Sequence, residues 1–509
     1  MHATVLVGII SVDKISSAPH LADSTMQYRN LPLRSLLLAS ACAALTACAT
    51  LPSIKAPAPP KDAASLASQN ALGSGTAAFP QDNWWTAYAD PALDALIAEA
   101  LAGSPDMTLA AARIRSADAI AEQAGAALVP SLSVEGAAGG NKQSYNMGIP
   151  AQFVPKGIVS TGKLSANLGF NLDLWGRNRA ALAAARGDAE AARVDAQQAR
   201  LLLTTSVASA WADFSQIWAS RDVAAEAVRI RGETEQLTEA RMRAGIDNAA
   251  DLELARSRHA AARAELAALD EALALNRNRI AALLGAGPDR GASLPRPALS
   301  LASETLVPAN LSANLVGRRP DLVSARLRAE AAASRVKVAK RDFYPNINLS
   351  AVAGLQSLGL SKLFESGSSN ANFGPAISLP IFDGGRLAGR YRGASAAYEE
   401  AVARYDQTLI LSFREVADAL ESKRALETRL SASRGANRSA AEAARLAGLR
   451  YRQGVGNLLQ VLAAEDAALS ARRAVTDLEA RAFLLDISLI RALGGGFSLQ
   501  SLSRENSDQ

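Results

Sequence analysis

Histidine, cysteine and aromatic residues are all scarce in this sequence of 509 residues. It has three histidines and two cysteines, and 5% of its residues are aromatic although 49% are hydrophobic. His2 and His20 lie in an N-terminal segment that we expect to be removed, and His259 alone cannot build a histidine-based metal site. This scarcity argues against most metalloenzymes and redox enzymes, so we expect neither an enzyme nor a cofactor.

Charge of one sign is lacking as well. The 54 lysines and arginines are nearly balanced by 49 aspartates and glutamates, and the two signs are interspersed along the chain. A nucleic-acid-binding surface would gather basic residues without the acidic ones, so we expect no nucleic-acid partner. The alanine-rich remainder favours closely packed helices over a thick globular core.

A short apolar run near the N-terminus is typical of a secretory signal. Residues 36–47 follow Arg34 and end in Leu-Thr-Ala before Cys48, which resembles the lipobox of bacterial lipoproteins. We predict a signal peptide over 26–47, a mis-assigned start over 1–25, a covalent lipid such as palmitate on Cys48, and a flexible lipid-anchored tether over 48–80. The alternatives are Cys42 as the lipidated residue and a buried helix with an ordinary cysteine.

The chain contains one pattern twice. Pro105 and Gly139 recur as Pro320 and Gly354, about 215 positions later, and RMRAG at 241–245 recurs as RYRQG at 450–454, about 209 positions later. Two constant offsets indicate an internal duplication with about six extra residues in a loop of the first copy. We predict a first repeat over 81–295, a second over 309–496, and a disordered tail over 497–509.

Long stretches without proline predict unusually long helices. Residues 176–242 and 385–451 are rich in strong helix formers, and each predicts one helix about 100 Å long. Such lengths exceed any compact domain and indicate a coiled-coil-like assembly. Shorter helices would return from each to Gly285 and Gly494, and further helices are predicted near 106–128 and 321–343.

Four short segments alternate between apolar and polar residues, as membrane barrel strands do. The clearest are 164–174 and 346–354, and 131–139 and 373–382 are weaker versions. The residues predicted to face lipid are Leu164, Leu168, Phe170, Leu172, Ile347 and Leu349. A half-buried hairpin in a soluble domain is the alternative for any single segment. Four strands cannot close a barrel in lipid, so other copies of the chain would have to complete it.

Several strings together carry a family resemblance. They include LVPSLSVEGAAG (128–139), LDLWGRNRAALAAA (172–185), LVGRRPDLVSARLRAE (315–330), FYPNINLSAVAG (343–354) and RYRQGVGNLLQVLAAE (450–465). On these strings the chain resembles the TolC-like outer-membrane factors, in particular their lipoprotein (NodT/OprM-like) branch. The resemblance runs from Asn83 to about Gly496.

The resemblance implies a mainly α fold with a membrane β-barrel. It implies a homotrimer with a twelve-stranded barrel in the outer membrane and a helical barrel crossing the periplasm. Such a duct would export small molecules such as drugs, together with a periplasmic adaptor (membrane fusion protein) and an inner-membrane pump of the resistance-nodulation-division type. The alternatives are a channel for type I protein secretion and a non-conducting, periplasm-spanning structural lipoprotein.

The turns that end the long helices are the candidate working parts. Glycine at 245 and 454 allows the positive φ that such a reversal needs. In the family these tips meet the adaptor, which implies the docking residues Arg243, Gly245, Asp247, Arg452, Gly454 and Asn457. Leu459 matches a ring leucine of the closed gate, whereas the family's acidic ring position falls at Ala463. Glu465 and Asp466 are the nearby acidic candidates for the gate.

Overall fold

The computed structural model describes residues 51–54, 58–66, 78–146, 148–299 and 311–498. The predicted signal peptide, Cys42 and Cys48 lie outside the described residues. Part of the predicted tether is docked instead of free, because Ala63 is buried in a cluster with Leu315 and Leu409 and the backbone N–H of Lys61 donates to Asp406 at 2.9 Å. Phe497 is buried beside Val194 and Val323, so the packed chain reaches beyond the predicted end of the second repeat.

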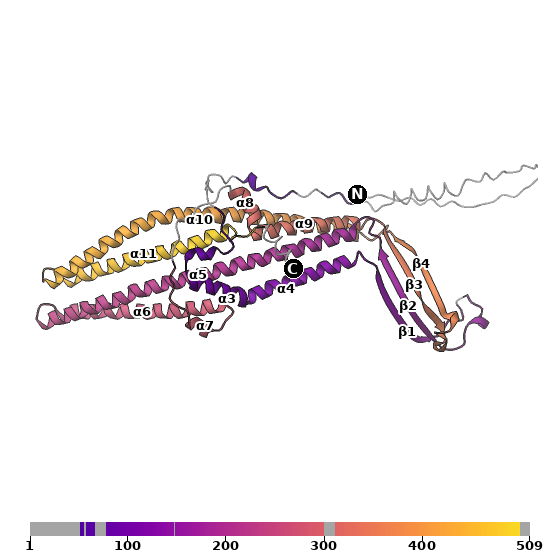
Figure 1. The fold of residues 1–509 in the computed structure, drawn as a ribbon, viewed down its shortest axis with the longest axis horizontal. Helices are drawn as coiled ribbons and strands as arrows, with labels where there is room; N and C mark the ends of the chain where they lie inside the picture. The colour runs from indigo at the N-terminus through magenta and orange to yellow at the C-terminus, as the bar shows by residue number, and fades with distance from the viewer. Residues whose placement is uncertain (1–50, 55–57, 67–77, 147, 300–310, 499–509) are drawn as a thin grey trace, which may run out of the picture. The chain divides into compact units, whose positions relative to one another are not determined.

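The two repeats have nearly the same elements at nearly the same lengths (Figure 1). The first contains α3 (Pro91–Gly103), α4 (Pro105–Ala126), β1 (Ser131–Asn141), β2 (Val159–Asn171), α5 (Arg177–Arg243) and α6 (Ala249–Leu283). The second contains α8 (Leu311–Arg318), α9 (Pro320–Arg341), β3 (Asn346–Leu358), β4 (Ser369–Ser378), α10 (Arg386–Arg452) and α11 (Leu458–Ala492). Both long helices have 67 residues and both returning helices have 35. The predicted fold class, mainly α with two tandem repeats of long helices and two strands each, is confirmed.

The helices pack as two hairpins joined by the shorter helices. Along its second half α5 lies beside α6, and α10 lies beside α11 in the same way, as Figure 1 shows. Along their first halves, α4 packs on α5, and α9 packs on both α5 and α10. A contact between α11 and α5 connects the two hairpins. Each long helix is therefore covered by two shorter helices in succession.

Glycines fix the place where each returning helix meets the other helices of its repeat. A Cβ on Gly285 would lie 2.4 Å from the carbonyl oxygen of Gly103, and one on Gly494 would lie 1.9 Å from that of Arg318. Both glycines also have positive φ values, of 74° and 93°. The same close approach thus occurs at equivalent positions of the two repeats, which explains the paired glycines of the sequence.

The strands form one antiparallel sheet in the order β1-β2-β3-β4. The predicted strand over 164–174 is shifted in the structure, because β2 begins at Val159 and ends at Asn171. Leu172, predicted to be a strand residue, lies just past its end, although its N–H still donates to Ile347 at 3.1 Å. The next residue, Asp173, has a φ of 41° and caps α5, which ends the extended conformation.

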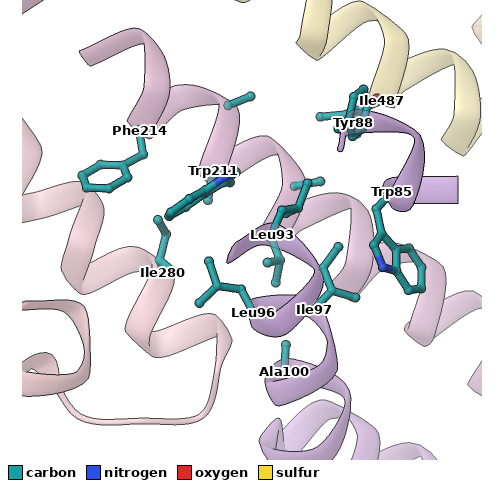
Figure 2. Packing of buried hydrophobic residues seen from close by; sticks show 14 of the residues in the cluster. Trp85, Tyr88, Leu93, Leu96, Ile97, Ala100, Trp211, Phe214, Ile280 and Ile487 are labelled. Carbon is teal, nitrogen blue, oxygen red and sulfur yellow. The ribbon is translucent and has the colours of Figure 1, made fainter. Parts of the chain in front are cut away.

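A compact aromatic and aliphatic core lies where α3 meets α5 and α6 (Figure 2). Trp211 and Phe214 on α5 are fully buried there, with Leu93 and Ile97 on α3 packed beside them. The buried carboxylate of Asp90 caps α3 and also accepts from the indole of Trp211 at 2.8 Å. This core anchors the start of the first repeat to the middle of α5.

None of the described helices is both long and apolar enough to cross a membrane.

Candidate functional site

The sheet has one apolar face that runs across all four strands. In the register, Leu132 pairs with Leu168, Leu168 with Ala351, and Ala351 with Phe373, so these side chains share a face. Five of the six predicted lipid-facing residues belong to this face: Leu164, Leu168, Phe170, Ile347 and Leu349. The residues of this face on the two edge strands are strongly exposed in the single chain: Phe373 on β4 is 84% exposed and Leu132 on β1 is 70% exposed.

The opposite face of the sheet is polar. Asn167, Ser350 and Asn372 lie on it, and Asn171 donates to Asn346 at 2.6 Å across β2 and β3. An apolar outer face with a polar inner face is the arrangement of strands around an aqueous lumen in a membrane. In the described part of the chain β1 pairs only with β2, and β4 only with β3, so both edges are open.

Ion pairs and aromatic stacking hold the sheet to the helices. Asp342, at the end of α9, accepts from Arg177 at the start of α5 and from Arg390 on α10, the latter at 3.0 Å. Trp175 stacks on Tyr344 with 5.2 Å between ring centroids. The ends of three helices are thereby fixed beside the place where the strands begin and end.

At the other end of the long helices, the two turns have the same geometry. Gly245 and Gly454 have φ values of 71° and 78°, and the following N–H groups bond back to Arg241 and Arg450. This is a glycine-ended helix stop, which confirms the reason predicted for the two glycines. Asn457 caps α11 by accepting from the N–H of Gln460 at 2.9 Å.

Other predicted tip residues are either exposed or engaged within the chain. Arg243 is exposed and bonds to Glu239 at 2.8 Å, and Arg452 is also exposed. Ile246 and Val455, which the sequence reasoning did not select, are 63% and 65% exposed at equivalent positions of the two turns. Each turn therefore presents one apolar side chain at its apex.

Asp247 joins the first turn to the second hairpin. It accepts from Arg241 at 2.8 Å and from the hydroxyl of Tyr451 at 2.5 Å. Arg241 also donates to the backbone of Tyr451 at 3.1 Å and lies over its ring, and Thr238 bonds to the same hydroxyl at 3.1 Å. We call Thr238, Arg241, Asp247 and Tyr451 the tip network.

Electrostatics within the tip network favour the hydrogen bond between Tyr451 and Asp247. The bond from Arg241 holds the pKa of Asp247 below its usual value, and burial, followed by the bond to Asp247, raises the pKa of Tyr451. The carboxylate is therefore charged and the phenol protonated at neutral pH. Arg241 and Tyr451 lie inside the repeated RMRAG and RYRQG strings, so the repeat itself was the signal that could have identified them.

The candidate gate residues on α11 point in two directions. Leu459 is 68% exposed, and Ala463, one turn further, is exposed on the same side. Asp466 instead accepts from Arg231 on α5 at 2.6 Å and from Arg258 on α6 at 3.0 Å. The exposed stripe near the turn is thus uncharged.

Glu465 is buried against α5, where Thr234 donates to it at 3.0 Å. Together with Asp466 it holds the second hairpin to the first. Neither acid is therefore a free carboxylate on the exposed stripe.

A sheet with an apolar outer face, joined to paired helical hairpins, defines a class of membrane channel-forming proteins. Within that class, the chain belongs to the outer membrane efflux protein family, whose model matches residues 96–286 and 311–495. Membership of a family of channels confirms the predicted resemblance and the prediction that the protein is not an enzyme.

Named relatives and a solved structure agree with this family. The chain is 34% identical over 352 residues to the fusaric acid resistance protein FusA of Burkholderia cepacia, a match that covers 64% of each chain. It is 31% identical over 435 residues to the multidrug resistance outer membrane protein MdtP of Escherichia coli K12, covering 82% of this chain and 87% of MdtP. The crystal structure of the Vibrio cholerae outer membrane protein VceC matches with a TM-score of 0.78 and 40% identity, covering 82% of this chain and all of VceC.

Proposed function

We propose that the protein is the outer-membrane exit duct of a tripartite pump that exports small molecules such as drugs. The observation that carries this proposal is the apolar sheet face together with its two open edges. Backbone groups left unpaired in hydrocarbon cost several kcal/mol each, at roughly 2–7 kcal/mol per group. Further copies of the chain must therefore close the sheet.

Three copies are the smallest number that leaves an open pore. Two copies would give an eight-stranded barrel, whose interior is just wide enough for side chains to fill. Three copies bring twelve strands, enough for an aqueous channel. We therefore propose a homotrimer in which the long helices continue the barrel into the periplasm.

The paired turns are the proposed docking point for a periplasmic adaptor. Ile246 and Val455 offer exposed apolar side chains at the two turns, and the exposed Arg243 and Arg452 lie nearby in the sequence. The adaptor would connect the duct to an inner-membrane pump of the resistance-nodulation-division type. The tip network would hold the closed state, and opening would require the second hairpin to move away from the first.

The proposals of drug export and of lipid anchoring are supported by different observations. FusA and MdtP are both named for resistance, which favours small toxic molecules as cargo. The lipid on Cys48 rests on the lipobox, because this residue lies outside the described part of the chain.

A deletion strain tests the proposed function. We expect loss of the gene to raise dye accumulation and antibiotic sensitivity, and the wild-type gene to restore both. The double variant Ile246→Asp and Val455→Asp should reach the outer membrane yet fail to restore efflux. Gln453→Asp, which adds one negative charge at a polar position of the turn, should restore it. Cys48→Ser should abolish incorporation of labelled palmitate.

Other outcomes would redirect the assignment. Unchanged drug sensitivity with loss of one secreted protein would replace drug export by type I secretion. A strain with neither defect would overturn the exit-duct proposal.

A further inference from the structure

A cavity of about 390 Å³ lies between α5, α10 and α11 and extends to the end of α10 at Arg452. It exists because small residues line one wall: Ala441, Ala444 and Gly448 on α10, and Ala468 on α11. A Cβ on Gly448 would meet nothing within 4 Å, which confirms open space there. The rest of the lining combines apolar side chains, among them Ile230, Leu237, Val461 and Leu469, with a few charged ones.

Glu465 is one of the lining residues, and only one oxygen of its carboxyl group has a hydrogen-bond partner among the described residues. The residue is 9% exposed, and Thr234 bonds to its Oε1 atom. Among the described residues Oε2 is buried and has no hydrogen-bond partner. A buried carboxylate oxygen without a partner is costly unless a donor or cation completes it. Burial accordingly raises the pKa of Glu465.

The neighbouring charges are already committed to other partners. Arg231 donates to Asp466, and Arg445 is held by Glu442 at 2.7 Å. Glu226 and Glu233, the other acids of the cavity, are both bound by Arg229.

Two further cations line the described part of the cavity, and neither bonds to the unpaired oxygen. Arg472 lies seven residues, or about 10 Å, along α11 from Glu465, and Arg452 is the last residue of α10. Among the described residues that line the cavity, Glu465 is therefore the acid with a carboxyl oxygen still available to bond a ligand.

We propose that this cavity binds a small amphipathic organic cation, with its ammonium group on Glu465 Oε2 and its apolar body against Ile230 and Leu469. Both chemistries are needed, because an apolar molecule would leave the oxygen unpaired and an inorganic cation would leave the apolar walls empty. The ligand would contact helices of both hairpins. Its binding would therefore stabilise the arrangement in which the hairpins are joined, a role beyond that of a passive duct.

Two probes of one shape test the site on the full-length protein in lipid nanodiscs. Isothermal titration calorimetry would compare 4-phenylbutylammonium with the uncharged 4-phenylbutanol. We expect wild type to bind the cation about ten-fold or more tightly than the alcohol. Glu465→Gln should bring the two probes to within about two-fold of each other.

Two further variants separate the site from general effects. Ala444→Leu keeps the carboxylate but fills the cavity, so it should lose binding of both probes even if Glu465→Gln were to misfold. Glu253→Gln removes a largely exposed acid on α6, outside the cavity lining, and should bind like wild type. Equal affinity of wild type for the two probes, undiminished cation binding by Glu465→Gln, or no saturable binding of the cation by wild type would each overturn the proposal.

Discussion

At the scale of single residues, the hydroxyl of Tyr451 is one of the points where the two halves of the chain meet near their turns. It donates to Asp247 and bonds to Thr238, which both belong to the first repeat. The equivalent of Asp247 in the second repeat is Gly456, so the turn of that repeat has no carboxylate there. The second turn therefore cannot make the equivalent hydrogen bond, and the two turns differ in this contact.

Tyr451→Phe should loosen the closed state. It removes the hydroxyl and leaves the carboxylate of Asp247 with Arg241 alone, a loss of about 1–3 kcal/mol from the contact between the hairpins. We expect a higher single-channel conductance in planar bilayers. Tyr398→Phe, on the same helix but outside the tip network, is the matched control, and equal conductance of the two variants would contradict a latch at Tyr451.

The pH dependence of stability should report the burial of Glu465. Because its pKa is raised in the folded protein, the stability linked to its neutral form is fully present below the ordinary pKa of 4.5 and is lost as pH rises through the raised value. Glu465→Gln imitates the neutral form. We therefore expect a higher Tm than wild type at pH 7 and no difference at pH 4, measured by far-UV circular dichroism. A difference that stayed constant with pH would contradict this.

The roles of single residues could be predicted where they depend on local backbone conformation. They could not be predicted where they depend on contacts with residues distant in the sequence. Gly245 and Gly454 were predictable because a reversal with positive φ favours glycine in any context. The tip network was not, because it depends on α5 and α10 being brought together from residues more than 200 positions apart. For the same reason Glu465 and Asp466 could be named as acids near the gate, but not as side chains held by α5 and α6.

At the scale of elements, the close approach of Gly494 to Arg318 should be intolerant of any side chain. Gly494→Ala would place a Cβ 1.9 Å from a carbonyl oxygen at a φ of 93°, which we expect to cost about 2–5 kcal/mol of folding free energy. The lower midpoint of thermal unfolding would measure it. Gly393→Ala, in open space within α10, should instead stabilise by about 0.5–1 kcal/mol. Similar midpoints for the two variants would refute the packing argument.

The helices were easier to predict than the strands. Proline is absent from these stretches and strong helix formers are abundant. The two features together predicted the ends of the long helices to within one or two residues of the observed ends. The start of β2 was missed because Ser160 and Gly162 stand at positions of the apolar face, whereas Asp173 continues the alternation into a capping turn. The docking of residues 61–66 beside α8 and α10 had no local signal, since Ala63 becomes a core residue only through neighbours that are distant in the sequence.

At the scale of the whole molecule, the two faces of the sheet should respond oppositely to charge. Phe373→Arg puts a cation on the apolar face, which costs about 2–4 kcal/mol near the middle of a bilayer. We expect less oligomer in the outer-membrane fraction, measured by native gel electrophoresis. Asn372→Arg, one residue away on the polar face, should assemble normally. Equal assembly of the two variants would mean that the apolar face does not meet lipid.

Much of the molecular architecture could be predicted because the repeat, the strand alternation and the helix lengths are encoded locally. The number of copies could not be derived from the sequence pattern alone. An open sheet edge shows that another chain must pair with it, but not how many chains form the barrel. Two copies are excluded only by the further requirement that the barrel have a hollow interior. The cavity beside Glu465 was equally hidden, because small residues on α10 leave a space only when α5 and α11 frame it.

Having both halves in a single polypeptide has a consequence for how such a ring can move. The proposed homotrimer has six such halves around its pore. If each half were a separate identical chain, every mutation would change all six, whereas fusion lets mutations accumulate in one half without altering the other. In the proposed channel, the first hairpin would stay in place while the second moves. The duplication would then allow one half of each chain to form a fixed part of the wall and the other half a movable part.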